Sequence, residues 1–427
     1  MAIVLIPIGV LLLYLAERYL FKTYWNRGLD VRLAFSDKPV NEGDLANISE
    51  VITNRNFLPL PIVTVSFQTD NGVTPKPELQ KGDTFPNVTV SDRTSVVEVF
   101  SVKLYERITR QLTLACEKRG YYAVLQASAT STDLFNNQVG YMNFPQNTSL
   151  YVYPARLTDA ETEVPYRRVM GEVLSRIRLY EDPFSFRGIR DYTPLDPPSA
   201  INWKATARTN DLRVNEKDHT AGQTVLILLD LEDPAVLFDT SLLEDCIRYT
   251  YNLALRLISE KIPVGIATNG RDILEDAREF RSNAGDRVAA AANSSGRGAG
   301  QNSSVRNSGQ GAGQNSPGLS ALKGIAMNLA AGSSAAHATA VSEFLSRIDL
   351  RKNRAPFAEV ISAAANNSSR ESEIVCLIGS CQRDDVIKAA NDLARARGSL
   401  TWLCPLRTGM ELRAEGGEYD FIPLIRK

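Results

Sequence analysis

The spacing of the hydrophobic residues changes near Thr224, and this change constrains the fold more than any other feature of the sequence. Before it, apolar and polar residues alternate in short stretches such as LPIVTVSFQ and TSVVEVFSVKL. After it, continuous apolar stretches such as TVLILLDL are separated by segments of helical spacing. Alternation is typical of strands with one solvated face, whereas continuous stretches are typical of strands buried on both faces. The sequence therefore predicts two structurally different parts.

Residues 28–154 show only the alternating pattern, interrupted by turn signals such as NEGD at 41–44. Several short strands with no helical segment between them predict an antiparallel β-sandwich of immunoglobulin-like size. Nothing in this region indicates catalysis. We expect it to be a spacer or a docking module.

Residues 224–427 alternate between strands and helices, which predicts a doubly wound α/β domain with a parallel sheet. The expected strands are residues 224–231, 263–270, 373–380 and 399–406. The expected helices are residues 241–261, 321–330, 337–348, 355–365 and 383–398. Residues 282–318 are rich in Ser, Asn, Gly and Ala, a composition that predicts a disordered insert.

The first 16 residues carry no charge, and Glu17 and Arg18 follow them. Continuing the helix through Phe21 gives a length that could cross a membrane if these two charged side chains snorkel to the interface. Aromatic residues at 14, 19, 24 and 25 could form an interfacial belt. No basic segment precedes the apolar run and no convincing cleavage site follows it, which disfavours a signal peptide.

Basic residues at positions 18, 22 and 27 lie after this apolar run. The positive-inside rule then places the rest of the chain in the cytoplasm. We therefore expect residues 1–25 to form a single-pass transmembrane anchor in the cell membrane, with the body of the protein in the cytoplasm.

The formal net charge of −1 argues against a protein that binds nucleic acid electrostatically. The five cysteines are scattered and have mostly apolar flanks, which predicts buried, reduced thiols. With only His219 and His337 present, and no Gly-x-Ser-x-Gly motif, the sequence offers little for histidine-based catalysis. We predict that the protein is not an enzyme.

Three carboxylates, Asp230, Glu232 and Asp233, follow the first strand of the α/β part directly. Ligands of open α/β sheets bind at the carboxyl ends of strands, and a hard cation such as Mg²⁺ would suit these oxygen ligands. The alternative is a solvated loop whose acids cap and solubilise neighbouring structure. We expect no cofactor, with Mg²⁺ as the weaker possibility.

The connecting segment, residues 155–223, contains the unusual stretch RGIRDYTPLDPPSAINWKATARTNDLRVNEK at 187–217. It interleaves charges of both signs around a single tryptophan. Arginines suit bidentate pairing with carboxylates, and Trp203 is an anchor of the type found at interfaces. The candidate partner-binding residues are Arg187, Arg190, Asp191, Tyr192, Asp196, Trp203, Lys204 and Arg208.

Two interpretations of this stretch are compatible with each other. In the first it is a docking surface for a partner protein. In the second it is an interdomain clamp, in which Trp203 is buried and Arg190 pairs internally with Asp196. Nucleic-acid binding is disfavoured because the interleaved acids cancel the positive field.

The succession of FRGIRDY, DP, INWKATAR and LRV in this stretch resembles the signature of a bacterial family, domain-of-unknown-function family number fifty-eight. The resemblance implies a membrane segment, a β-rich region and then a von Willebrand factor A-like domain. It also implies partnership with a MoxR-type AAA+ ATPase. Metal-binding A domains carry Asp-x-Ser-x-Ser after the first strand, but here Glu232 and Pro234 replace both serines. The resemblance therefore does not extend to a Mg²⁺ site.

These observations predict a membrane-anchored, cytoplasm-facing interaction protein without enzymatic activity. The resemblance implies an adaptor or co-chaperone for a MoxR-type ATPase, working in the assembly or maturation of envelope-associated complexes. One alternative is a ligand-binding domain that depends on a divalent cation. The other is a hydrolase with an unrecognised pair of carboxylates.

Overall fold

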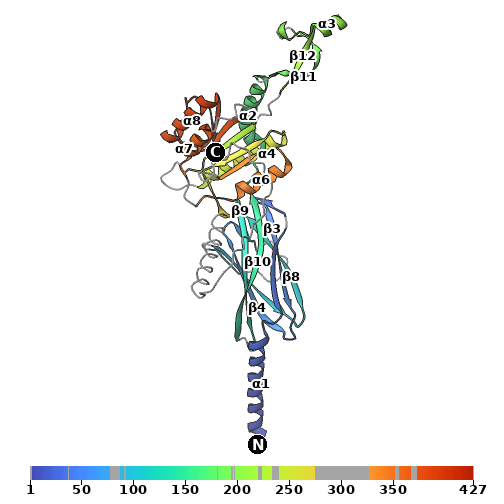
Figure 1. Cartoon of the computed structure of the whole chain (residues 1–427). Helices are drawn as coiled ribbons and strands as arrows, with labels where there is room; N and C mark the ends of the chain where they lie inside the picture. The colour runs from blue at the N-terminus through green and yellow to red at the C-terminus, as the bar shows by residue number, and fades with distance from the viewer. Residues whose placement is uncertain are drawn as a thin grey trace, which may run out of the picture. The chain divides into compact units, whose positions relative to one another are not determined.

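The structure of the chain is a computed structural model (Figure 1). It describes residues 2–36, 38–76, 87–90, 93–133, 135, 137–179, 181–193, 196, 198–219, 224–232, 240–274, 327–351, 355–366 and 373–426. The chain forms two compact units, residues 1–156 with 345–347, and residues 157–344 with 348–427. The expected disordered insert at 282–318 lies outside the described residues.

The first unit is built on two β-sheets. One sheet has the strand order β1-β3-β8-β5, with β1 at Leu29–Phe35, β3 at Leu45–Asn54, β8 at Arg107–Cys116 and β5 at Val73–Pro75. The other has the order β2-β10-β9-β4-β7-β6, with β2 at Val40–Asn41, β10 at Gln138–Tyr153, β9 at Gly120–Thr132, β4 at Leu60–Asp70, β7 at Arg93–Val102 and β6 at Asn87–Val90. All neighbours pair antiparallel except β2 and β10.

The alternation of side chains along these strands explains why the two sheets pack together. Ile48 and Ile52 of β3 and Leu112 of β8 are almost fully buried, while the alternate residues Ser49 and Val51 of β3 are partly exposed. They join Val65 and other residues of the second sheet in one apolar cluster. Burying each such side chain contributes about 1.5–3 kcal/mol. The antiparallel strands predicted for residues 28–154 are present as two sheets around this core.

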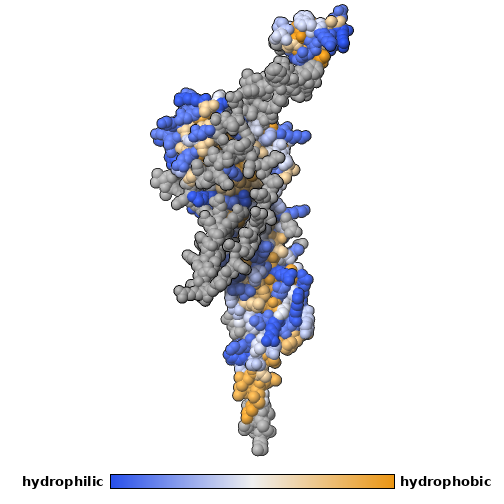
Figure 2. Space-filling model, viewed as in Figure 1, coloured by the Kyte–Doolittle hydropathy of each residue, from blue (hydrophilic) through white to orange (hydrophobic). Residues whose placement is uncertain are grey.

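Helix α1 (Ala2–Tyr24) precedes the sandwich, and its end is part of the sandwich core. Phe21 is 2% exposed and Trp25 is 4% exposed. The Trp25 indole covers Gly140 of β10 so closely that a Cβ on this glycine would come within 2.6 Å of the ring. Earlier in the helix, apolar side chains such as Leu13 are exposed. Figure 2 shows hydrophobic colouring over the described part of α1.

The predicted single-pass anchor at residues 1–25 is wrong, and so are the membrane location and cytoplasmic orientation derived from it. Within the described residues, no helix is both long enough and apolar enough to cross a membrane. The 16 uncharged residues span roughly 24 Å as a helix, against about 30 Å of hydrocarbon. The extension through Phe21 fails because this side chain lies in the sandwich core. Two residues of the expected aromatic belt, Tyr14 and Tyr24, contact the rings of Phe135 and Phe57.

We predict that Phe21→Ala lowers the free energy of unfolding of this unit by about 3–5 kcal/mol, because it leaves a cavity in the core. Leu13→Ala is the matched control, since Leu13 is 72% exposed. Chemical denaturation of both variants measures the difference. Equal losses in the two variants would show that the end of α1 does not belong to the core.

The second unit is centred on a six-stranded sheet with the order β16-β14-β13-β18-β19-β20. Its strands are β13 (Thr224–Leu229), β14 (Val264–Thr268), β16 (Met327–Gly332), β18 (Glu373–Ile378), β19 (Leu400–Arg407) and β20 (Asp420–Arg426). All neighbouring strands are parallel except β14 and β16, which are antiparallel. β13 is central and its residues from Val225 onward are buried, as its continuous apolar sequence predicts.

Helices cover this sheet. They are α2 (Asp159–Leu179), α4 (Thr240–Ser259), α6 (Ala335–Ser346), α7 (Phe357–Asn366) and α8 (Asp384–Arg397). Apolar residues of α7 and α8 form one core with Leu226, Leu228 and Trp402 on one face of the sheet. α4 contacts β13, β14, β18 and β19, and α2 packs against α4. Two short strands, β15 (Arg271–Asp272) and β17 (Ile348–Asp349), pair separately.

The predicted fold class needs correction. Strands make up 42% of the structure, so the chain is mostly β, and neither a transmembrane helix nor a von Willebrand factor A-like domain is supported. The α/β sheet is mixed, not parallel throughout. Residues 327–330, the end of a segment expected to be helical, belong instead to the edge strand β16. Pairing with β14 supplies backbone hydrogen bonds that outweigh the local helical spacing.

Candidate functional site

The loop after β13 begins with Asp230, whose side chain is fully buried. The backbone N–H of Asp230 donates to the carbonyl oxygen of Ile378 at 2.8 Å. Its Oδ1 accepts the N–H of Glu232, also at 2.8 Å. Gly379 lies directly against it, since a Cβ there would come within 2.4 Å of Asp230 Cβ. Asp230 therefore occupies the space between the ends of β13 and β18 and fixes the start of the loop.

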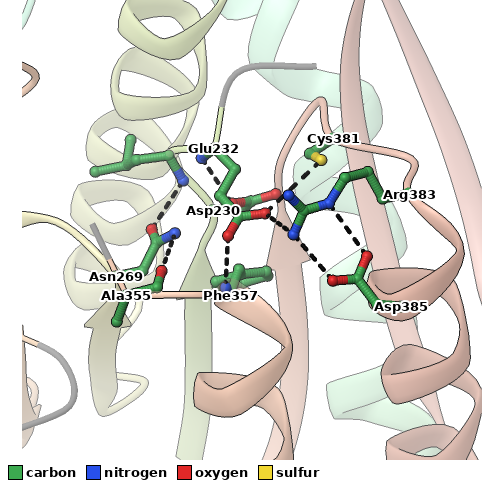
Figure 3. A network of polar contacts seen from close by, with 9 residues as sticks. Asp230, Glu232, Asn269, Ala355, Phe357, Cys381, Arg383 and Asp385 are labelled. Carbon is green, nitrogen blue, oxygen red and sulfur yellow. Dashed lines mark hydrogen bonds and ion pairs between the residues drawn. The ribbon is translucent and has the colours of Figure 1, made fainter. Parts of the chain in front are cut away.

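Glu232 uses both carboxylate oxygens to join this loop to two helices (Figure 3). Oε1 accepts the N–H of Phe357, the first residue of α7, at 2.8 Å. Oε2 lies 2.6 Å from Nη2 of Arg383, which immediately precedes α8. The Cys381 thiol also donates to Oε2, at 3.9 Å. A carboxylate that accepts from a helix N-terminus satisfies an N–H that lacks an intrahelical partner and complements the helix dipole.

Four further hydrogen bonds extend the network. Arg383 donates through Nε and Nη2 to the two oxygens of Asp385, at 3.1 and 2.9 Å. The N–H of Leu231 donates to Asn269 Oδ1 at 3.0 Å, and Asn269 Nδ2 donates to the carbonyl oxygen of Ala355 at 3.3 Å. The ends of β13 and β14 and the starts of α7 and α8 are thus held by one set of polar contacts.

Three buried thiols, Cys246, Cys381 and Cys404, lie close enough to Asp230 to feel its charge. Burial raises the pKa of Cys381 to about 12, and the Asp230 carboxylate contributes to the rise. Burial also raises the pKa values of the other two thiols. Protonated, buried thiols are poor nucleophiles and poor metal ligands. All five cysteines of the chain are free and buried, which confirms the predicted reduced thiols.

The weak metal candidates Asp230, Glu232 and Asp233 do not form a cation site in the part of the chain that is described. Asp233 lies outside the described residues. Among the described residues, no group of three or more His, Cys, Asp or Glu side chains could hold a metal ion. Glu232 is already neutralised by Arg383 and caps α7. The capping interpretation fits Glu232, but Asp230 is buried and not solvated.

We predict that Gly379→Ala lowers the free energy of unfolding by about 1–3 kcal/mol, because the new methyl group overlaps Asp230 and forces the strand ends apart. Gly171→Ala is the matched control. Gly171 lies in α2 and has open space around its Cα, so alanine there should stabilise by about 0.5–1 kcal/mol. Chemical denaturation of both variants checks the opposite signs.

The connecting segment forms a small module of its own, which we call the β11–α3–β12 module. β11 (Glu181–Asp191) pairs antiparallel with β12 (Arg213–His219), and the 3₁₀ turn η2 (Pro198–Ala200) and α3 (Trp203–Thr209) lie between them in sequence. Ile201 forms an isolated bridge to Val214, which is buried. The hairpin is absent from the sequence prediction because the hydrophobic period of residues 187–217 is weak.

Asn202 positions α3 on the hairpin. Its Oδ1 accepts the N–H of Ala205 at 3.0 Å, which caps the helix. Its Nδ2 donates to Asn215 Oδ1 of β12 at 2.6 Å, and its backbone N–H donates to the carbonyl oxygen of Arg213 at 2.8 Å. Asn210 ends the helix in the left-handed conformation at φ 62°. An asparagine immediately before the apolar-charged run WKATAR is the cap signal that could have predicted this short helix.

Arg190 and Asp196 pair within the module, as the clamp interpretation expected. Arg190 donates from Nη1 and Nη2 to the two Asp196 oxygens, at 2.7 and 2.5 Å. Thr193 adds its backbone N–H and its hydroxyl, both at 2.8 Å from Asp196 Oδ2. The pKa of Asp196 is therefore held well below its usual range, first by Arg190 and then by Thr193. A second ion pair joins Asp191 and Arg213 across the two strands.

Trp203 differs from the clamp interpretation, because its side chain is 67% exposed. Lys204 and Arg208, one helical turn apart on α3, are also exposed. Tyr192 is half-buried, and its N–H donates to the carbonyl oxygen of Leu212 at 3.0 Å. The backbone of Arg187 lies in β11, but its side chain is outside the described part of the structure. The structure thus brings the candidate partner-binding residues onto one small module.

We predict that Arg190→Gln raises the pKa of Asp196 toward the ordinary value for aspartate, since the guanidinium is the main cause of its depression. The depressed pKa stabilises the folded module above the pKa of an unfolded aspartate, about 3.9. This stabilisation is lost as the pH falls further toward the pKa of the folded module. Carboxyl-detected NMR titration measures the shift. Arg213→Gln, which removes the other ion pair, should leave Asp196 unchanged.

No family model matches the chain, and no curated protein matches it. Solved structures match at low similarity. The PapD-like domain 7 of human CEP192 has a TM-score of 0.20 and 12% identity over 30% of this chain and 87% of that one. A non-cellulosomal cohesin from Archaeoglobus fulgidus has a TM-score of 0.20 and 9% identity over 32% and 98%. The major pilin SpaD from Corynebacterium diphtheriae has a TM-score of 0.22 and 9% identity over 29% and 34%. Similarity at this level carries no argument about function.

Proposed function

We propose that the protein is an interaction protein that recruits a partner through the β11–α3–β12 module. The exposed side chain of Trp203, on a helix whose position is fixed by Asn202, is the observation that carries this proposal. A tryptophan offers a large apolar contact area at low cost in side-chain entropy, and it is enriched among residues that dominate binding energy. Without a partner, a tryptophan side chain is expected to be largely buried in its own fold.

The module holds this tryptophan on a rigid base. The hairpin, the bidentate pair of Arg190 with Asp196 and the capped helix each fix part of the described backbone of the module. Binding to a surface that is already ordered avoids much of the ordering cost of association. Two more apolar side chains of the module, Ile189 and Leu212, are 46% and 45% exposed and enlarge the apolar area.

The charges on the module indicate the chemistry of the partner. Asp191 and Asp196 are used in internal ion pairs with Arg213 and Arg190. Within the described residues, Lys204 and Arg208 form no ion pair. A partner surface with an apolar pocket for Trp203 and carboxylates for the two basic side chains complements this arrangement.

The carboxylates after β13 do not favour a second candidate function. Asp230 accepts the N–H of Glu232, and Glu232 contacts Arg383 and the N–H of Phe357, so both acids hold the end of β13 to the starts of helices. The partner class that the family resemblance implies is a MoxR-type AAA+ ATPase, with the protein acting as its adaptor or co-chaperone in the assembly or maturation of envelope-associated complexes. We include this identity in the proposal because the module carries the residues on which the resemblance rests.

The experiment places a photo-crosslinking amino acid at position 203 of the full chain in cells, and at Leu412 as the control, an apolar side chain of the second unit that is 41% exposed. Cross-linked proteins are identified by mass spectrometry. We expect capture at position 203 and not at 412. Capture of an AAA+ ATPase supports the adaptor role, whereas capture of a different protein supports the docking surface and replaces the ATPase as partner.

With the captured partner purified, we predict that Trp203→Ala weakens binding about tenfold or more, as loss of an interface anchor does. The thermal unfolding of the variant should match that of the unsubstituted protein, because the side chain is largely solvated. Leu412→Ala should bind normally. Unchanged affinity of folded Trp203→Ala would rule out the module as the docking surface.

A further inference from the structure

Three charged side chains lie on the inward faces of the sandwich strands. Glu50 of β3 is 1% exposed and Glu98 of β7 is 3% exposed, and these two strands belong to different sheets. Arg110 of β8 is directly opposite Glu50 in the strand register, so the two side chains leave the same face of their sheet. Nη1 of Arg110 then lies 2.7 Å from Glu98 Oε2. The arginine thereby connects the two acids across the core.

If both glutamates are ionised, this group has too few hydrogen-bond donors for its carboxylate oxygens. Arg110 serves Glu98 Oε2, but neither Glu50 oxygen nor Glu98 Oε1 meets a hydrogen-bond donor among the described residues. A carboxylate has no hydrogen to donate, and leaving a buried one without a donor is costly. One proton on either carboxyl group supplies the missing donor and reduces the buried charge to a single carboxylate beside a single guanidinium.

We propose that Glu50 and Glu98 share one proton between the two sheets, that Arg110 balances the remaining charge, and that this proton makes the sandwich sensitive to pH. Two carboxyl groups that lie near each other cannot both ionise readily, because their negative charges repel. The strands flanking the group present apolar side chains beside it, Leu33 opposite Glu50 and Val65 opposite Glu98.

Burial is the main cause that raises the pKa of Glu50 well above its usual range, followed by the charge of Glu98 and the hydrogen bond to it, while Arg110 opposes the rise. The folded sandwich therefore keeps a proton at pH values where an unfolded glutamate, with a pKa of about 4.3, has lost it. Unfolding releases this proton, so stability falls as the pH rises from about 4.3 to the pKa of the folded pair. The contribution of this pair to stability is therefore complete below about pH 4.3 and is lost at higher pH.

The first test is carboxyl-detected NMR of the full chain labelled at glutamate. We expect one glutamate signal that titrates far above the others and is absent in Glu50→Gln. Glu98→Gln distinguishes sharing from burial alone, since it leaves Arg110 free to pair with Glu50. The pKa of Glu50 should then fall. A Glu50 signal that titrates with the other glutamates, or one that Glu98→Gln leaves unmoved, would overturn the proposal.

The second test is hydrogen exchange of the peptides that cover β3 and β8, corrected for the intrinsic change of exchange rate with pH. Opening of these strands should increase as the pH rises above about 4.3, by up to tenfold per pH unit, the limit for release of one proton. Glu50→Gln should remove this increase, and Glu117→Gln, at an exposed glutamate of the same unit, should retain it. Peptides of β13 serve as the internal reference. The same pH dependence in Glu50→Gln and in the unsubstituted protein would contradict the proposal.

Discussion

The second unit depends on how the carboxylates after β13 are satisfied. In a parallel sheet, loops connect the end of each strand to the start of the following helix. In this unit, charged side chains hold these strand ends and helix starts together. Asp230 packs on Gly379 and accepts a backbone N–H, while Glu232 caps α7 and pairs with Arg383 before α8. Because each acid has a donor within the protein, the edge that could have been a ligand site is a structural joint. This explains why it retains carboxylates without collecting further metal ligands from the described residues.

The sequence predicts the elements whose cause is local, and it fails where the cause is distant. Continuous apolar runs place β13, β14, β18 and β19 correctly, because a strand buried on both faces has no polar positions to spare. Residues 327–330 end a segment of helical spacing, yet they belong to the edge strand β16 because β14 offers them partners. The hydropathy of α1 similarly predicts a membrane span. The contact of Trp25 with Gly140 cannot be read from the sequence, because it joins residues far apart in the chain.

The candidate residues show the same division. The tryptophan and the arginine–aspartate pairs of residues 187–217 can be chosen from the sequence by their chemistry, but their exposure cannot. Arg383 and Asn269 carry no motif, and Phe357 contributes only its backbone N–H to a carboxylate 125 residues away. Glu50, by contrast, had a visible signal. In LANISEVIT the inward positions run Ala46, Ile48, Glu50 and Ile52, so a charge stands where the period of two requires an apolar residue.

Glu232, Asp196 and Glu50 show that the environment of a carboxylate decides what it can do for a protein. Glu232 and Asp196 each meet an arginine and a backbone donor, so they fix local geometry. Glu50 faces a second acid, and Arg110 already serves that acid, so we infer that a proton supplies the donor that Glu50 lacks among the described residues. Charged residues that are fully paired by the chain contribute rigidity. A buried acid without a donor makes stability depend on the solution, and for this reason the sandwich, not the carboxylate edge of the α/β sheet, is where this protein can respond to its surroundings.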